Sequence, residues 1–135
     1  MVFVDANAFI GLLNRKSSLH QLAIQKSAKI KQENEILATS DIVVAETITV
    51  LSSRIDRRLA LTFGSEIEEG GIQIFYLEPE TLSLAWKIFQ KQTSKNVSFF
   101  DCTSFAIIEK YKVDKVFSFD SDFVKHGKNL GWEFV

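Results

Sequence analysis

The chain has 135 residues, a length that favours one folded domain over residues 1–135. Its net charge is −1, so it lacks the strong positive charge typical of proteins that wrap duplex nucleic acid. A hydrophobic content of 46% with a single proline is typical of a globular protein and disfavours disorder. The only cysteine, Cys102, excludes an internal disulfide and favours a reducing compartment, for which we expect the cytoplasm.

The first half of the chain predicts strand, helix, strand and helix in that order. Residues 2–5 form a short β-branched and aromatic run, which indicates a strand. Residues 19–34 place apolar side chains on one face at helical spacing. Residues 36–39 predict a second strand, after which Ser40 or Asp41 caps a long apolar helix that runs to about Arg54.

The second half continues this alternation. A glycine pair at 70–71 ends the next helical segment, and residues 72–76 follow as a third strand. Pro79 opens another helix, and Asp101 is expected to begin the one after it. The last two predicted strands are residues 116–119 and 132–135.

Strands separated by ten or more helical residues favour an α/β fold, with a parallel sheet covered by helices on both faces. In open parallel sheets, ligands bind beyond the carboxyl ends of the strands, where the strand order reverses. Asp5 and Asp120 each end a predicted strand, so we expect both at that edge. The start of the chain lacks a basic leader and no apolar run nears ~18 residues, so we expect neither a secretory signal nor a membrane span.

Three of the aspartates also allow a plainer interpretation. Asp5, Asp101 and Asp120 each stand where a helix begins, and aspartate is a favoured N-cap residue. Taken singly, capping explains Asp5 and Asp101 well. Two strand-end aspartates that converge at one sheet edge are harder to explain by capping alone.

Glu46 has no such plain interpretation, because it interrupts an apolar stripe on its predicted helix. A carboxylate among buried apolar groups costs free energy unless it is paired or bound to a cation. A buried Lys or Arg is one possible partner, but the nearest basic residues fall at the end of that helix. A metal ion is therefore the better candidate.

Convergence of these carboxylates would itself require a cation, because their mutual repulsion raises some of their pKa values and opposes folding. Oxygen ligands without thiolates suit Mg²⁺, with Mn²⁺ as a second choice. Bound divalent ions would also add positive charge at the site, so the low net charge does not exclude a nucleic-acid substrate.

Other kinds of site find little support in the sequence. His20 and His126 are the only histidines, they lack a metal-binding spacing, and we expect both on the surface. Cys102 is accompanied by no local histidine and is expected to be a small core residue rather than a nucleophile. No glycine-rich nucleotide-binding motif is present.

The order and spacing of the four acids resemble those of the PIN-domain family, especially the VapC-type toxins of toxin–antitoxin pairs. The resemblance covers nearly the whole chain and rests on four segments, each with one acid: residues 2–7, 39–46, 98–102 and 117–123. It implies a PIN-like three-layer α/β/α sandwich with a central sheet of four to five strands. It also implies an enzyme, a Mg²⁺-dependent endoribonuclease that hydrolyses phosphodiester bonds of RNA.

The resemblance assigns roles to individual residues. The catalytic and metal-binding residues that it implies are Asp5, Glu46, Asp101 and Asp120. Residues beside the acids that it implies are Asn7, Ser118 and Asp122, with Ser118 standing where threonine is common. The partners that it implies are an RNA substrate, a small antitoxin protein and a second copy of the chain. Basic residues considered for contact with RNA are Arg54, Lys91, Lys95 and Lys125.

Two alternatives stay open at this point. The first is a PIN-like RNA-binding module without catalytic activity, against which the presence of all four acids argues. The second is a phosphoaspartate phosphatase or receiver-like domain that uses Asp5 as its nucleophile. Such phosphatases usually carry a second aspartate two positions later, where this chain has Asn7.

Overall fold

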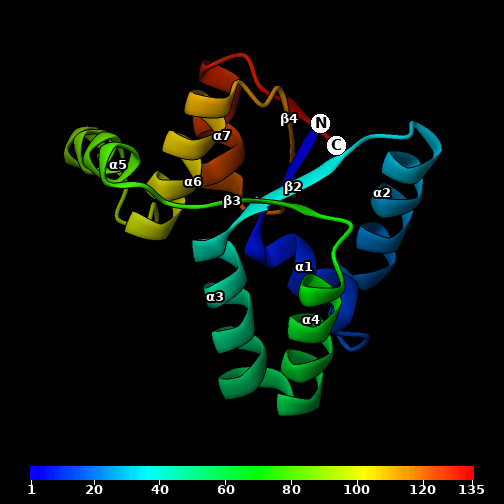
Figure 1. Cartoon of the computed structure of the whole chain (residues 1–135). Coiled ribbons are helices and arrows are strands. Elements are labelled where there is room, and N and C mark those ends of the chain that lie inside the picture. Colours follow the sequence, from blue (N-terminus) through cyan, green and yellow to red (C-terminus); the bar gives the residue numbers. More distant parts are fainter.

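The computed structural model describes all of residues 1–135 and contains a five-stranded parallel sheet in the order β3-β2-β1-β4-β5 (Figure 1). The α/β class predicted from the sequence, with a central parallel sheet, is confirmed. The five strands are β1 (Val2–Val4), β2 (Leu37–Ser40), β3 (Gln73–Phe75), β4 (Lys115–Phe117) and β5 (Glu133–Phe134).

Seven α-helices and one π-helical turn connect these strands. Helices α5, α6 and α7 lie on one side of the sheet in Figure 1, α1 and α2 lie on the other side, and α3 and α4 extend beyond one edge. The helices are α1 (Ala6–Leu13), α2 (His20–Gln32), α3 (Asp41–Val50), α4 (Arg57–Glu69), α5 (Pro79–Lys91), α6 (Phe99–Tyr111) and α7 (Ser121–Asn129), and the π-helical turn η1 is Leu51–Ile55.

The strand order reverses beside β1, and this reversal positions the candidate site. The chain adds β2 and β3 on one side of β1 and later adds β4 and β5 on the other side. Val4 pairs with Phe117 in register, and the Asp5 amide donates a hydrogen bond of 3.1 Å to the Phe117 carbonyl. The residues that follow β1 and β4 therefore lie side by side at the carboxyl edge.

The core is formed by the central strands and by α6. Val2, Phe3 and Val4 are buried, as are Val116 and Phe117 of β4. Helix α6 is buried over the seven consecutive residues 102–108, which contribute apolar and small polar side chains. A helix buried around most of its surface is held rigidly, so the first turn of α6 is a firm support for a side chain at the sheet edge.

Helix boundaries follow identifiable local signals. The side chain of Asp56 caps α4 by accepting a hydrogen bond of 2.8 Å from the Arg58 amide. At the other end of α4, Gly70 and Gly71 have φ values of 90° and 97°, which glycine adopts without steric cost. Pro79 occupies the first turn of α5, as the sequence predicts.

The apolar helix predicted to run to about Arg54 changes form before its end. Helix α3 ends at Val50, and the π-helical turn η1 continues to Ile55, closed by a hydrogen bond of 2.8 Å from the Asp56 amide to the Leu51 carbonyl. The hydroxyls of Ser52 and Ser53 both donate to the Thr49 carbonyl. Such side-chain donors compete with the regular helical ladder, which accounts for the wider turn.

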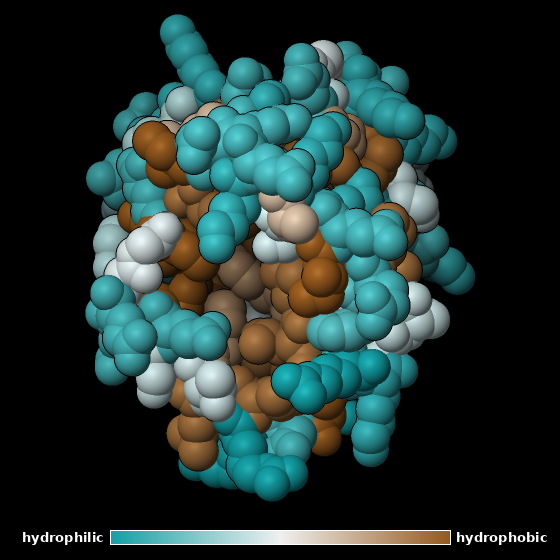
Figure 2. Space-filling view, turned by 90° about the vertical axis from the view of Figure 1, so that its right-hand side faces the viewer, coloured by the Kyte–Doolittle hydropathy of each residue, from teal (hydrophilic) through white to brown (hydrophobic).

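Apolar side chains also occur outside the core. Figure 2 shows the side of the molecule that carries α2 and α4, where hydrophobic residues line a hollow surrounded by hydrophilic ones. Leu22 of α2 and Leu61 of α4 are 43% and 59% exposed. None of the helices combines the length and the hydropathy that crossing a bilayer requires.

Candidate active site

Asp5 lies at the carboxyl end of β1 and is almost completely buried, with 5% of its surface exposed. The Ser118 hydroxyl donates a hydrogen bond of 2.9 Å to its Oδ2 atom. Burial raises the pKa of Asp5 to about 7, against the opposing effect of this hydrogen bond. Asp5 stands at the N-cap of α1, but its side chain makes no capping hydrogen bond, so the capping interpretation does not explain it.

Asn7 and Ser118 join the start of α1 to the segment that follows β4. Asn7 Oδ1 accepts a hydrogen bond of 2.9 Å from the Phe119 amide, and Asn7 Nδ2 lies 3.4 Å from Ser118 Oγ. Ser118 Oγ also accepts a hydrogen bond of 3.2 Å from the Asp120 amide. These contacts fix the position of Asp120 relative to Asp5, although more than a hundred residues separate the two in the chain.

Asp101 occupies the third position of α6 rather than its beginning, which corrects the prediction that it begins the helix. The helix begins at Phe99, and Ser98 is its N-cap. The Asp101 amide donates to Ser98 Oγ at 3.1 Å, and Asp101 Oδ2 accepts from the Ser98 amide at 2.8 Å. This reciprocal capping box satisfies two backbone groups and fixes the carboxylate at the sheet edge.

The electrostatic environment of Asp101 links it to the other acids. Burial raises the pKa of Asp101, and the charges of Asp120 and Asp122 raise it further, against the lowering effect of the Ser98 amide. The Asp101 charge in turn raises the pKa of Asp5, together with that of Glu46. Asp101 is therefore the one acid that interacts electrostatically with each of the other three.

Glu46 projects from α3 and is half-buried, as the interrupted apolar stripe predicts. Burial raises the pKa of Glu46, and the neighbouring charge of Asp101 raises it further. No basic side chain forms an ion pair with Glu46. The ion pairs of the protein are Met1–Glu35, Lys29–Glu33, Arg58–Asp56, Lys110–Glu78, Lys115–Glu33 and Lys115–Glu35.

Asp120 does act as a helix cap. Its Oδ1 atom accepts hydrogen bonds from the amides of Asp122 and Phe123 at 2.8 and 2.9 Å, at the start of α7. Asp122 accepts a weak hydrogen bond of 3.4 Å from Ser94 Oγ, a contact for which the sequence carries no signal. The capping interpretation therefore holds for Asp120, whose second carboxylate oxygen makes no hydrogen bond within the protein.

The donor set of these acids fits a divalent cation. Three of the four carboxylates have raised pKa values, and none of the four joins an ion pair. Acidic oxygens that repel one another and lack a positive partner are the ligands that Mg²⁺ binds. As the side chains stand, no three His, Cys, Asp or Glu residues form a group that could hold an ion. The four acids to which the sequence points thus share one edge without forming a closed ligand cage.

Both histidines depart from the predicted surface location. His126 is half-buried and stacks on Phe105 with ring centroids 3.9 Å apart, and burial lowers its pKa. His20 is also half-buried, and its Nδ1 atom lies 2.9 Å from the Gly11 carbonyl oxygen. Cys102 is fully buried, as predicted, and burial raises the pKa of its thiol to about 11. None of these three residues joins the acids.

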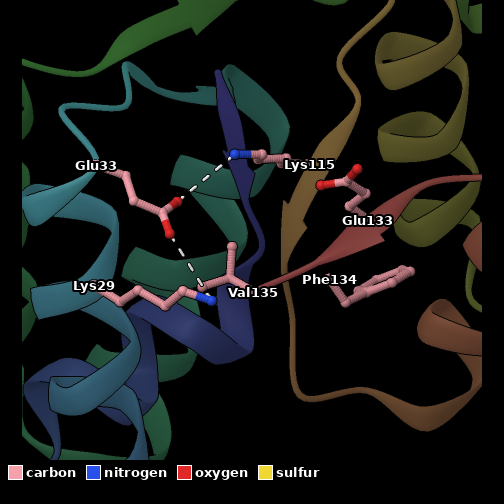
Figure 3. A pocket seen from close by; sticks show the side chains of 6 residues that line it. All are labelled: Lys29, Glu33, Lys115, Glu133, Phe134 and Val135. Carbon is pink, nitrogen blue, oxygen red and sulfur yellow. Dashed lines mark ion pairs between the residues drawn. The ribbon is translucent and has the colours of Figure 1, made fainter.

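A second group of charged residues lies at the opposite, amino edge of the sheet. Figure 3 shows Glu33 between Lys29 and Lys115, beside the end of the chain. Glu33 pairs with Lys29 at 3.9 Å and with Lys115 at 3.6 Å. Opposite charges balance here, in contrast to the carboxyl edge.

Residues 2–129 match the PIN domain family. The chain belongs to the PIN domain family. The family proposed from the order of the four acids is therefore confirmed, and the match includes every one of the acids in question.

Two further comparisons connect this PIN domain with VapC toxins. It is 27% identical over 127 residues to the 23S rRNA-specific endonuclease VapC20 from two strains of Mycobacterium tuberculosis, across 94% of this chain and 95% of the relative. The crystal structure of M. tuberculosis VapC20, a Sarcin-Ricin loop cleaving toxin, superposes with a TM-score of 0.83 at 24% identity and covers 94% of this chain and 95% of that chain. The PIN domain described here is thus related to the VapC-like toxin ribonucleases and shares their fold.

Proposed function

We propose that this PIN domain is a Mg²⁺-dependent endoribonuclease that hydrolyses phosphodiester bonds of RNA. The observation that carries the proposal is the group of four acids at the point where the strand order reverses, none of which is paired with a basic side chain. The relation to an rRNA endonuclease supports the same reaction class.

Asp5, Glu46, Asp101 and Asp120 would hold Mg²⁺, for which Mn²⁺ could substitute. When bound, the metal would supply an activated water and offset the charge that develops on the phosphate. The protein itself orients the carboxylates through hydrogen bonds. Ser118 holds the Asp5 carboxylate, the capping box holds Asp101, and the first amides of α7 hold Asp120. Groups held this way need little rearrangement when substrate binds.

We further propose the biological setting that the VapC relation suggests. In this proposal the chain is a single-domain toxin that acts in the cytoplasm, forms a homodimer and is restrained by a small antitoxin protein. VapC20 of M. tuberculosis acts on 23S rRNA, so structured rRNA is the first substrate class to test. Co-purification with the product of a neighbouring small gene, and sedimentation of the purified chain at micromolar concentration, test the antitoxin and the dimer separately.

The central experiment compares RNA cleavage by the unaltered protein with cleavage by two Asp→Asn variants purified identically. Asp101→Asn removes the acid that interacts with all the others, while the amide oxygen of asparagine can still accept from Ser98. Asp114→Asn is the matched control, because Asp114 is exposed and precedes β4 at the amino edge. The substrates are 23S rRNA and a panel of RNA hairpins, each with Mg²⁺ and with a chelator.

Cleavage that requires both Mg²⁺ and Asp101, and that survives Asp114→Asn, is the expected result. Equal cleavage by Asp101→Asn would indicate a contaminating nuclease and contradict the proposal. RNA binding without cleavage in any sample would instead indicate a PIN module without catalytic activity. A phosphoryl group trapped on Asp5 would favour the phosphoaspartate alternative, which the 5% exposure of Asp5 disfavours.

A further inference from the structure

Five exposed basic residues gather at the end of the molecule farthest from the amino edge, in two segments that are far apart in the sequence. Within residues 14–19 and 51–60 the only acid is Asp56. A shallow pocket is lined from both segments, by Arg15 and Lys16 on one side and by Ile55 and Asp56 on the other. We call these five basic residues the basic tip: Arg15, Lys16, Arg54, Arg57 and Arg58.

Most of the charge of the basic tip is available to a partner. Asp56 pairs with Arg58 at 2.9 Å, and the other four cations make no ion pair within the protein. The lysines at the amino edge differ, because Lys29 and Lys115 are balanced by glutamates. A surface with four unpaired cations attracts polyanions far more strongly than the net charge of −1 suggests.

The basic tip is connected to the candidate active site by two helices. Helix α1 begins immediately after Asp5 and ends at Leu13, two residues before Arg15. Helix α3 carries Glu46, and eight residues later the π-helical turn carries Arg54, a rise of ~12 Å. Helices α1 and α3 pack against each other. Figure 1 shows both helices extending from the carboxyl edge of the sheet toward the same end of the molecule.

We propose that the basic tip binds the phosphate backbone of an RNA strand whose scissile bond lies among the four acids. This inference rests on the proposed ribonuclease function and names the path of the substrate. A rise of ~12 Å corresponds to three or four nucleotides at the ~3.4 Å per nucleotide of a stacked strand. The tip therefore holds phosphates a few nucleotides from the reacting one and offsets the repulsion between RNA and the carboxylates.

The position of the tip favours RNA over an acidic protein segment as its occupant. The cations lie just beyond the ends of the two helices that lead away from the acids, where a continuous polyanion that passes through the site can also reach them. Arginine, which supplies three of the four unpaired cations, binds phosphate through paired N–H donors. A protein partner remains a distinct outcome of the test below.

The test measures how salt affects RNA binding by two double variants, both built on Asp101→Asn so that the RNA survives. Arg54→Gln with Arg57→Gln removes two cations from the tip. Lys29→Gln with Lys31→Gln removes two exposed cations at the amino-edge end of α2 and is the matched control. The probe is a short fluorescein-labelled oligouridine, titrated at several salt concentrations, and thermal unfolding of each variant verifies that it folds.

Each phosphate contact contributes ~0.7 to the slope of log K against log salt for single strands. The tip variant is expected to lower that slope by ~1.4 relative to Asp101→Asn alone and to weaken binding about tenfold at low salt, while the control leaves both unchanged. Equal slopes for the tip and control variants would overturn the inference but leave the nuclease proposal intact. If the tip variant binds RNA as well as Asp101→Asn does but no longer binds an antitoxin encoded by a neighbouring gene, the tip is a protein-binding surface and the inference is overturned. If no sample binds the oligouridine, this inference is overturned, whereas the nuclease proposal fails only if the unaltered protein also leaves 23S rRNA and the hairpin panel uncut.

Discussion

The two edges of the sheet each carry a carboxylate with a strongly shifted pKa, but the two shifts have opposite directions. At the amino edge, Glu35 accepts hydrogen bonds from Lys115 and from the amino group of Met1, and these contacts lower its pKa to about 2. At the carboxyl edge, Asp5 lies buried without a positive partner, and its pKa rises to about 7. The same kind of side chain is stabilised as an anion at one edge and destabilised at the other.

This difference separates structural acids from candidate catalytic ones. Folding alone favours ion pairs such as those of Glu35, because they stabilise the charged form. Unpaired buried carboxylates lower stability and are found where a ligand or a reaction requires them. Substitutions at the amino edge should therefore affect stability alone, whereas substitutions at the carboxyl edge should affect activity and improve stability in the absence of metal.

The largest expected effect is on RNA cleavage. Glu46→Gln should reduce the rate at least ~100-fold, because it removes a carboxylate from the proposed metal site. Glu35→Gln, the matched change at the amino edge, should leave the rate within about twofold. Initial rates of cleavage of 23S rRNA, or of the hairpin that the assay above shows to be cut fastest, measure both. A loss of equal size in the two variants would erase the distinction between the edges.

The second effect is on stability without metal. Because the folded pKa of Asp5 lies above its unfolded value of 3.8, Asp5 opposes folding increasingly as the pH rises from 3.8 to about 7. Asp5→Asn should therefore raise the free energy of unfolding by up to ~4 kcal/mol at pH 8 in chelator, with little change at pH 3.5. Urea denaturation at both pH values tests this prediction, and a gain of equal size at both would refute the electrostatic cause.

The third effect is the increase in thermal stability that metal binding is expected to produce. A cation that binds only the folded protein stabilises it by ~2.7 kcal/mol when its concentration is a hundredfold above Kd. Mg²⁺ should raise the Tm of the unaltered protein and of Glu35→Gln, and it should raise the Tm of Glu46→Gln much less. Scanning calorimetry across a Mg²⁺ titration gives the result. Equal shifts in all three proteins would place the metal away from the acids.

The smallest effect concerns the ion pairs of Glu35. Its folded pKa of about 2 lies below the unfolded value of 4.5, so its stabilising contribution is present above pH 4.5 and is lost as the pH falls toward 2. Glu35→Gln should lower the Tm modestly at pH 7, and the difference from the unaltered protein should shrink below pH 3. A Tm difference as large at pH 2.5 as at pH 7 would point to lost packing instead.

The strands and their connections could be predicted because their signals are local. The composition of residues 2–5, 36–39 and 72–76 predicts three strands, and Gly70-Gly71 and Pro79 mark the end of one helix and the start of the next. The side chain that each cap uses was harder to predict. Asp5, Asp101 and Asp120 look alike in the sequence, yet Asp5 makes no cap, Asp101 completes a capping box begun by Ser98, and Asp120 caps α7.

Several features of the structure could not be predicted from the sequence, most of them because they depend on contacts between residues that are distant in the chain. His126 is half-buried because Phe105, which lies on another helix, provides a stacking surface, and neither residue signals this locally. The π-helical turn is a local feature, but the two serine hydroxyls that donate to the Thr49 carbonyl leave the helical periodicity of the sequence unchanged. The basic tip likewise unites residues 15–16 with 54–58, which only the packing of α1 on α3 brings together.

The strand order also determines when during synthesis the site can exist. Asp5 leaves the ribosome well before Ser118, which holds its carboxylate and lies 113 positions later. Until those later residues are made, a nascent chain lacks β4, the neighbour of β1, and lacks Asp120 as well. For the ribonuclease proposed above, the fold thus delays assembly of the site until β4 and Asp120 have been synthesised, so that the earlier part of a nascent chain carries no complete site.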